Sequence, residues 1–166
     1  VMNWEEVQKI HRIIYDVVKT CMSNARWYAS DTVFIEPLSE WVNPHVDTPH
    51  RFDKWAQDQT LLGIQCIAPL YDLNMDNGAT GLVPKSQKKN FAIDMCYKGY
   101  YNGYFSRNYV QPSVKRGSVL MYNCRVLHSS MPNPTNQQRP AILFNYIDGS
   151  IIDELRTVDN IWNSNG

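Results

Sequence analysis

The hydrophobic period of the chain changes near residue 32, and this change constrains the fold more than any other feature. Before it, apolar residues recur at steps of three and four residues, which is the stripe of an amphipathic helix. Asn3 is the expected N-cap, and Glu5 and Glu6 suit the positive end of the helix dipole. The stripe consists of Val7, Ile10, Ile13, Ile14, Val17, Val18 and Cys21, with His11 at its edge as an expected packed residue.

From residue 32 the apolar runs become short and rich in β-branched and aromatic residues, as strands are. Pro, Gly, Asn and Asp separate the runs, and Asn77-Gly78 is a strong signal for a tight turn. The runs are "TVFIEPL", "LLGIQCIAPL", "ATGLVP", "SVLMYNCRVLH" and "PAILFNYI". This order predicts a mainly β protein with a flanking helix, in which the N-terminal amphipathic helix packs on the sheet of a β-sandwich or barrel.

The 166 residues contain no internal repeat and no linker, so we expect a single domain over 1–166. Its expected parts are a helical N-terminal support (1–31), a β core (32–147) and a C-terminal tail (148–166). Within the core, 91–111 is an expected insert that holds five of the ten tyrosines. We interpret it either as a loop that covers a pocket, with Tyr101 and Tyr104 as candidate substrate contacts, or as a structural loop.

Charge and cysteine content narrow the class of partner. The sixteen basic residues balance the sixteen acidic ones, so the strongly basic composition of nucleic-acid binders is missing. The four cysteines form no C-x-x-C pair and are expected to be reduced thiols. No apolar run reaches the ~18 residues of a membrane span. We therefore expect a cytoplasmic protein with a small-molecule substrate, no nucleic-acid partner and no membrane contact; the oligomeric state is not predicted.

The stretch "NPHVDTPHR" (43–51) is the first candidate site. In an extended segment residues i and i+2 share a face, so His45 and Asp47 project together. His50 lies five positions from His45 and follows Pro49, which makes it the weaker ligand candidate. The alternative is an ordinary polar turn.

A third ligand turns this pair into a metal site. His128 ends an apolar, strand-like run and opens a polar one. Two imidazoles and one carboxylate on one face form the facial triad of non-haem iron(II) oxygenases.

Three motifs, in order, carry a resemblance to a known family: "HVD", "DNGATGLVPKSQ" and "KRGSVLMYNCRVLHSSMPNPTNQQRPAILFNY". Over residues 32–147 the chain resembles the phytanoyl-CoA dioxygenase family of iron(II)- and 2-oxoglutarate-dependent oxygenases. The resemblance implies a double-stranded β-helix, which is a cupin-like jelly roll. It also implies Fe(II), 2-oxoglutarate and O2 as cofactor and co-substrates, and hydroxylation of a C–H bond with release of succinate and CO2.

The resemblance assigns roles to individual residues. His45, Asp47 and His128 match the catalytic metal ligands. Arg139 matches the arginine that holds the far carboxylate of 2-oxoglutarate, a role that suits a planar guanidinium. Ser130 shares a face with His128 and matches a serine that supports the same carboxylate.

Other positions refine or weaken this expectation. Asp47 separates the chain from related halogenases, which carry Gly or Ala at that ligand position. Lys85-Ser86-Gln87 stands where the family usually has Gly-Ser-His, and the segment before "HVD" is shorter than in typical members, so the local pocket is expected to differ. Trp55 lies near a family tryptophan and is a candidate substrate contact. Two rival interpretations stay open: a non-catalytic jelly-roll binding module, and an oxygenase that acts on a protein or nucleic acid.

Overall fold

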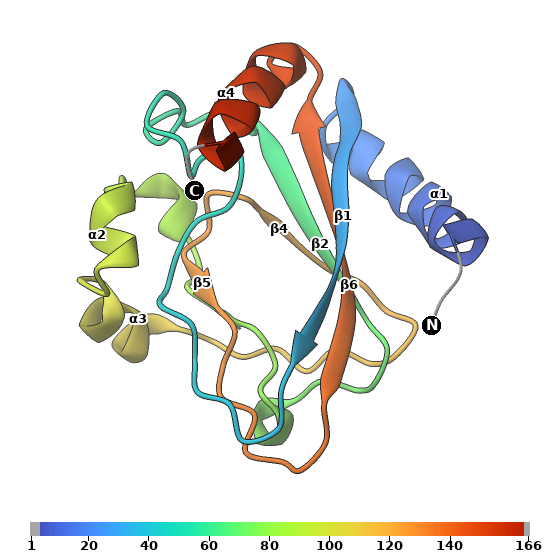
Figure 1. Ribbon diagram of the computed structural model, residues 1–166, viewed down its shortest axis with the longest axis vertical. Coiled ribbons are helices and arrows are strands. Elements are labelled where there is room, and N and C mark those ends of the chain that lie inside the picture. The colour runs from blue at the N-terminus through green and yellow to red at the C-terminus, as the bar shows by residue number, and fades with distance from the viewer. Residues whose placement is uncertain (1–3, 165–166) are drawn as a thin grey trace.

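The computed structural model describes residues 4–164, which leaves the expected N-cap Asn3 outside the described residues. Its centre is an antiparallel sheet of four strands in the order β1-β6-β2-β4, and a second sheet pairs β3 with β5 (Figure 1). The strands are β1 (Ala25–Ile35), β2 (Gly63–Pro69), β3 (Gly81–Leu82), β4 (Leu120–Asn123), β5 (His128–Ser129) and β6 (Arg139–Asp148). The expected mainly β architecture with an N-terminal helix is confirmed.

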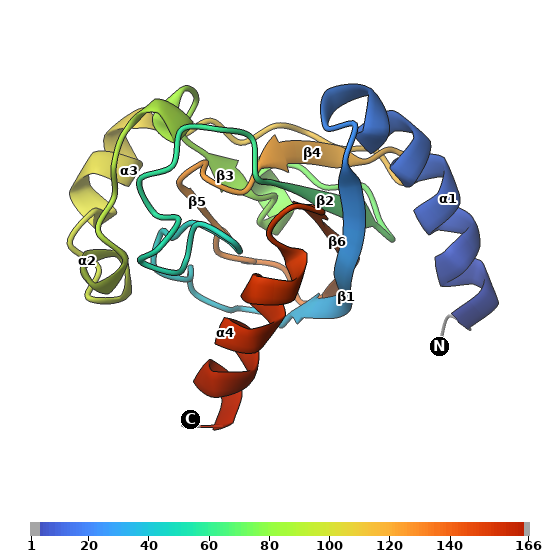
Figure 2. The same cartoon turned by 90° about the horizontal axis from the view of Figure 1, so that it is seen from above.

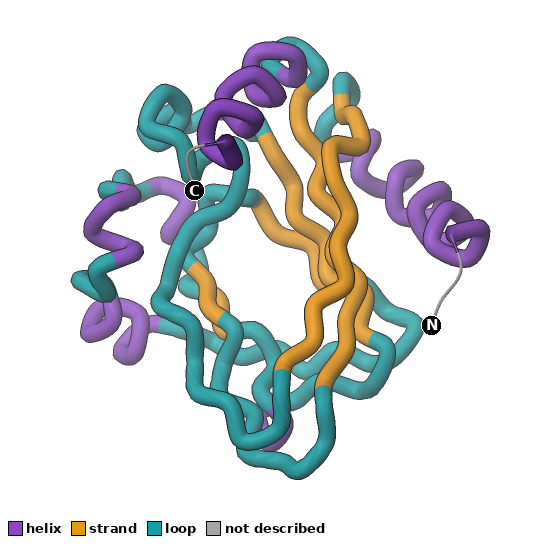
Figure 3. The backbone as a smooth tube through the Cα atoms, viewed as in Figure 1, coloured by secondary structure: helices purple, strands orange, loops and turns teal. Residues whose placement is uncertain are grey.

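Helices flank the two sheets, and two 3-10 turns lie in the loops (Figure 3). Gly78 ends the first of these turns with a φ of 76°, a left-handed conformation that glycine adopts without strain. The helical elements are α1 (Trp4–Cys21), η1 (Met75–Asn77), η2 (Ser86–Lys88), α2 (Ile93–Tyr97), α3 (Asn102–Asn108) and α4 (Ile152–Ser164). None of the helices in the described part of the chain is long and apolar enough to cross a membrane.

Three parts of the expected division differ from the structure: the start of the β core, the 91–111 insert and the C-terminal tail. The β core begins at Ala25, seven residues before the expected start, because β1 pairs with β6 along its whole length, from Ala25↔Asp148 to Ile35↔Arg139. The 91–111 insert is not an open loop, because α2 and α3 pack Cys96 and Phe105 into a buried cluster. The C-terminal tail contains α4, which buries Leu155 at the end of the sheet.

Helix α1 covers one face of the four-stranded sheet (Figure 2). Ile14 and Val18 pack there against the even-numbered residues of β2 and β6, among them Cys66, Phe144 and Tyr146. Burying each large apolar side chain contributes roughly 1.5–3 kcal/mol. The expected stripe is wider than the packed face, since Ile13 and Val17 remain exposed.

The opposite face of this sheet carries the odd-numbered residues of β2 and β6 and looks toward β3 and β5. The strand register places Gln65 opposite both Tyr122 and Asn145, and Ile67 opposite Leu143. Because side chains alternate along a strand, one face packs on α1 while the other is left to line a cavity.

Candidate metal centre and its cavity

A backbone bridge brings the first and third expected ligands together. His45 N–H donates to the carbonyl of His128 (2.9 Å), and His128 N–H donates to the carbonyl of His45 (3.0 Å). Residues paired in this way in an antiparallel ladder project their side chains to the same face. The two imidazole centroids therefore lie 4.4 Å apart, although 83 positions of sequence separate the residues.

Both imidazoles are oriented by their Nδ1 atoms. Nδ1 of His45 lies 2.9 Å from the carbonyl oxygen of Asn43, and Nδ1 of His128 lies 3.0 Å from that of Val126. A carbonyl only accepts hydrogen bonds, so each Nδ1 carries the proton. The lone pair of each imidazole is then on Nε2, which is the arrangement found in metal-bound histidines.

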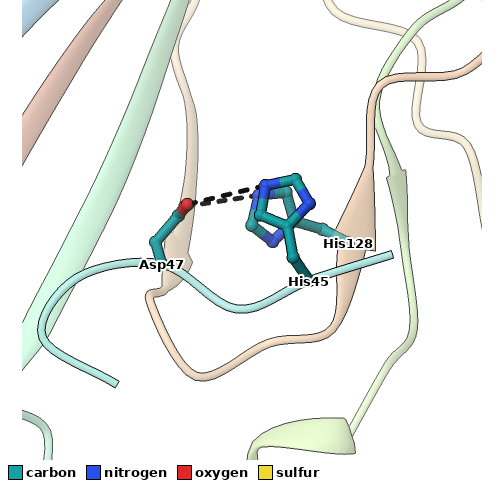
Figure 4. A group of neighbouring side chains, drawn as sticks. All are labelled: His45, Asp47 and His128. Atoms are coloured by element: carbon teal, nitrogen blue, oxygen red, sulfur yellow. Dashed lines mark ion pairs between the residues drawn. The ribbon is translucent and has the colours of Figure 1, made fainter. Parts of the chain in front are cut away.

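Asp47 completes the group (Figure 4). Its Oδ1 lies 3.8 Å from Nε2 of His45, and its Oδ2 lies 3.3 Å from Nε2 of His128. The backbone N–H of Asp47 donates to the carbonyl of Cys124 (2.8 Å), which fixes the segment beside the end of β4. The structure thus brings His45, Asp47 and His128 together, with ligand atoms that all lie within 4.8 Å of one another.

The electrostatics of the group suit a cation. Burial lowers the pKa of His128, which keeps its imidazole neutral and its Nε2 able to bind a metal. Burial and the nearby Asp47 carboxylate raise the pKa of Tyr122, which therefore stays protonated. The Tyr122 hydroxyl donates to Oδ2 of Asp47 (3.4 Å) and leaves Oδ1 free of that bond.

The triad opens into a cavity of about 190 Å³ between the two sheets, which we call the central cavity. Its apolar wall comes from β1, β2 and β6 and is formed by Val33, Ile35, Ile67, Ala141 and Leu143. Its polar groups are the three triad residues together with Gln65, Thr80, Tyr122, Ser130 and Arg139. A concave space in which polar groups converge opposite an apolar wall is typical of small-molecule sites.

Arg139 is the cation of this cavity. It is only 5% exposed, its Nε is buried, and among the described residues its guanidinium has neither a hydrogen-bond partner nor an ion pair. Burial lowers its pKa to about 10, so it remains charged near neutral pH. A buried cation without a partner is costly, and the vacant donors of Arg139 therefore indicate an anionic ligand.

Ser130 lines the same cavity as Arg139 and His128. Gln65, Thr80 and Tyr122 also line the cavity, although no motif of the sequence predicts them. The sequence contains a signal for two of them: Gln65 and Tyr122 are residues with polar groups inside the otherwise apolar strand runs "LLGIQCIAPL" and "SVLMYNCRVLH". Such a residue in a buried strand faces either a partner or a site.

The remaining candidates lie elsewhere. His50 is buried, with Nδ1 2.9 Å from the carbonyl oxygen of Trp55, and it is not part of the metal-binding group. Trp55 packs on Phe52 and Leu155 instead of lining the central cavity. The two expected contacts from the insert are also absent from the described lining of that cavity, because Tyr101 and Tyr104 pack against Phe91.

The comparisons with known proteins agree with this geometry. A family model described as "Phytanoyl-CoA dioxygenase (PhyH)" matches residues 6–141. A comparison with curated proteins found no match.

Several solved structures share the fold. The chain is similar to EvdMO1 (TM-score 0.69, 21% identity, 89% of this chain and 33% of that one). It is also similar to SnoN, a "non-heme alpha ketoglutarate dependent epimerase" from nogalamycin biosynthesis (TM-score 0.69, 16% identity, 87% and 56%). A third is HygX from Streptomyces hygroscopicus, solved with nickel and 2-oxoglutarate bound (TM-score 0.63, 17% identity, 81% and 61%). The chain thus spans between 33% and 61% of the length of these proteins.

Proposed function

Because this chain belongs to the phytanoyl-CoA dioxygenase family, we propose that it is an iron(II)- and 2-oxoglutarate-dependent oxygenase that hydroxylates a C–H bond of a small molecule. One observation carries the proposal: the His-Asp-His group and the buried Arg139 guanidinium line the same cavity. The His-Asp-His group offers ligands for a metal ion, and the Arg139 guanidinium offers a partner for the second carboxylate of a dicarboxylate bound to that ion.

The donor set fits the metal. Two neutral imidazoles and one carboxylate, without thiolate, match the facial triad of non-haem iron(II). His45 and His128 offer Nε2, because their Nδ1 atoms are bonded to backbone carbonyls. When bound, iron(II) and 2-oxoglutarate supply the activation of O2, and the co-substrate leaves as succinate and CO2.

The residues of the chain bind the co-substrate, orient the carboxylate ligand and keep water from the reacting atoms. Arg139 holds the far carboxylate of 2-oxoglutarate through its parallel N–H groups, and Ser130 supports that carboxylate with its hydroxyl. Tyr122 orients Asp47 by donating to Oδ2. The apolar wall formed by β1, β2 and β6 excludes water from the reacting atoms.

The same proposal covers the finer architecture. We assign the two sheets to a double-stranded β-helix, with the central cavity as its interior. The support is the arrangement of a four-stranded and a two-stranded sheet around the triad, together with the fold likeness to SnoN and HygX.

The test is 2-oxoglutarate-dependent formation of succinate, followed by NMR in aerobic, iron(II)-loaded protein. We expect slow succinate formation by the wild type and none by His128→Ala. His11→Ala is the matched control, because His11 stacks on Trp27 at the face of the sheet that packs on α1. A folded, iron-loaded wild type that forms no succinate would overturn the enzyme proposal and favour a binding module.

A further inference from the structure

A second hollow adjoins the triad on the side of Asp47 away from Arg139. It has a volume of about 230 Å³ and shares Asp47, Gln65 and Leu143 with the central cavity. The rest of its lining is Ala29, Ser30, Asp31, Thr48, Arg51 and Asn145. Asp47 therefore lies at the junction of two spaces, of which only one contains Arg139.

Two carboxamides form the floor of the second hollow. Gln65 of β2 and Asn145 of β6 are direct cross-strand partners, so their side chains lie next to each other on one face. Ala29, the partner of Asn145 on β1, has a small side chain that leaves space in front of the pair.

These carboxamides lack partners within the described chain. Gln65 is 6% exposed, and its Oε1 is buried without a hydrogen bond; Oδ1 of Asn145 is in the same state. Buried polar atoms are nearly always bonded in native proteins, and leaving one unbonded costs free energy. The two oxygens therefore require donors that a ligand can bring.

The charges of the hollow disfavour an anionic ligand group. The one cation in its described lining is Arg51; its Nη2 is already paired with Asp159 of α4, and its buried Nε is left without a partner. Asp31 and Asp47 would repel an anion. Phosphates and carboxylates thus have their partner in the central cavity, at Arg139, and none in the second hollow.

The chemistry of the lining matches hydroxyl groups. A carboxamide both accepts and donates, and so does a hydroxyl, whereas an ammonium only donates and an alkyl chain does neither. Ser30 and Thr48 add two further groups of the same dual kind. Only Ala29 and Leu143 of the lining are apolar, which leaves little surface for a fatty chain.

We propose that the second hollow is the subsite for the oxidised substrate, and that this substrate is a neutral, hydroxyl-rich small molecule held by Gln65 and Asn145. This inference rests on the proposed function, since it takes the central cavity as the site of 2-oxoglutarate. It departs from the acyl chain that the name of the family suggests.

The test measures binding separately from turnover. Two size-matched probe sets, methyl glycosides with cyclitols and medium-chain alkyl carboxylates, are titrated at millimolar concentration into protein that contains 2-oxoglutarate. Ligand-observed NMR gives the dissociation constants. We expect the polyols to bind and Asn145→Leu to weaken them about tenfold, the effect of one or two lost hydrogen bonds.

Asn136→Leu is the matched control, because it removes an exposed carboxamide from the loop before β6 and should leave polyol binding unchanged. Asn145→Ala repeats the measurement in case the leucine variant does not fold. Binding of the alkyl carboxylates alone, no binding by either set, or equal polyol binding by wild type and Asn145 variants would each overturn the inference. Polyol binding by a wild type that fails to bind 2-oxoglutarate would instead refute the proposed function, and the hollow would then be a polyol-binding site without an oxidised substrate.

Discussion

Two arginines are buried in the described part of this protein, and their surroundings are opposite in kind. Arg125 is 2% exposed and Arg139 is 5% exposed. The guanidinium of Arg125 donates to five acceptors in the loop after His50 and in and just after η2: the carbonyls of Ala56, Asp58, Gln87 and Lys89, and Oδ1 of Asn90. For Arg139, the described part of the chain offers no acceptor at all.

The difference separates a structural cation from a binding cation. Arg125 replaces its lost water with backbone carbonyls, so it joins two loops and leaves nothing for a ligand. Arg139 is buried without such partners among the described residues, and it lies in the cavity that holds the His-Asp-His group. Burial alone does not distinguish these two arginines; what distinguishes them is whether the buried guanidinium has hydrogen-bond partners.

Replacing Arg125 should have the largest effect. Arg125→Met removes the donor of five hydrogen bonds to half-buried and exposed loop residues. Each bond contributes about 0.5–1.5 kcal/mol, so we expect the free energy of unfolding to fall by roughly 3 kcal/mol or more. Urea denaturation followed by circular dichroism measures this change. A loss below about 1 kcal/mol would mean that the carbonyls find water easily, and the contrast between the two arginines would disappear.

Arg139→Met should have the reverse profile. We expect 2-oxoglutarate affinity to fall by roughly 10- to 150-fold, the value of a charged hydrogen bond. The free energy of unfolding should stay unchanged or rise, because a desolvated cation is removed. Calorimetric titration of the metal-loaded variant and urea denaturation of the apo-protein give the two numbers. Arg107→Met, at an exposed position of α3, should change neither number, and destabilisation of Arg139→Met to the extent expected for Arg125→Met would contradict the assignment.

His50 gives the Arg125 region a pH dependence. Burial lowers the pKa of His50, and the neighbouring Arg125 lowers it further. The unfolded chain therefore binds more protons than the folded one below about pH 6.5, and stability must fall as the pH drops through that value. In metal-free protein, His50→Leu should reduce this slope by up to about 1.4 kcal/mol per pH unit. An unchanged slope in denaturation curves between mild acid and neutral pH would assign the acid sensitivity to other groups.

Ser130→Ala tests the weakest partner of the proposed carboxylate site. One neutral hydroxyl contributes about 0.5–1.5 kcal/mol, so 2-oxoglutarate affinity should fall by roughly two- to tenfold. The loss should vanish when Arg139 is already methionine, since the carboxylate is then no longer held beside Ser130. Additive losses in this double-mutant cycle would show that the two residues act on different groups.

The sequence predicted which three side chains lie together, His45, Asp47 and His128, but not what surrounds them. Strand parity predicted that His45 and Asp47 share a face; their side chains do lie together, although the segment forms a single bridge at His45 and no strand. His128 was reached through a motif, and the structure supplies the physical reason, the backbone bridge between His45 and His128. Neither the partners of Arg125 nor the vacancy around Arg139 can be read from the chain, because both depend on which loops meet in three dimensions.

The misplaced candidates have the same cause. Trp55 is a candidate because it lies near a family tryptophan, and Tyr101 and Tyr104 because they belong to the tyrosine-rich insert. Each of the three packs against a local apolar cluster. Gln65 had a signal in the sequence, a polar residue in a buried strand, but its meaning depends on the register that pairs it with Asn145. The β core begins before the expected residue 32, because Ala25 and the residues after it pair with β6, and this pairing is not visible in the sequence.

The most direct test of the account is an anaerobic titration of iron(II) and 2-oxoglutarate into the apo-protein, read by the weak metal-to-ligand charge-transfer band in the visible. We predict a band in the wild type that is lost in His128→Ala and needs far more 2-oxoglutarate in Arg139→Met. A folded wild type without the band, or a band that persists unchanged in His128→Ala, would contradict the assignment of this cavity to iron and 2-oxoglutarate.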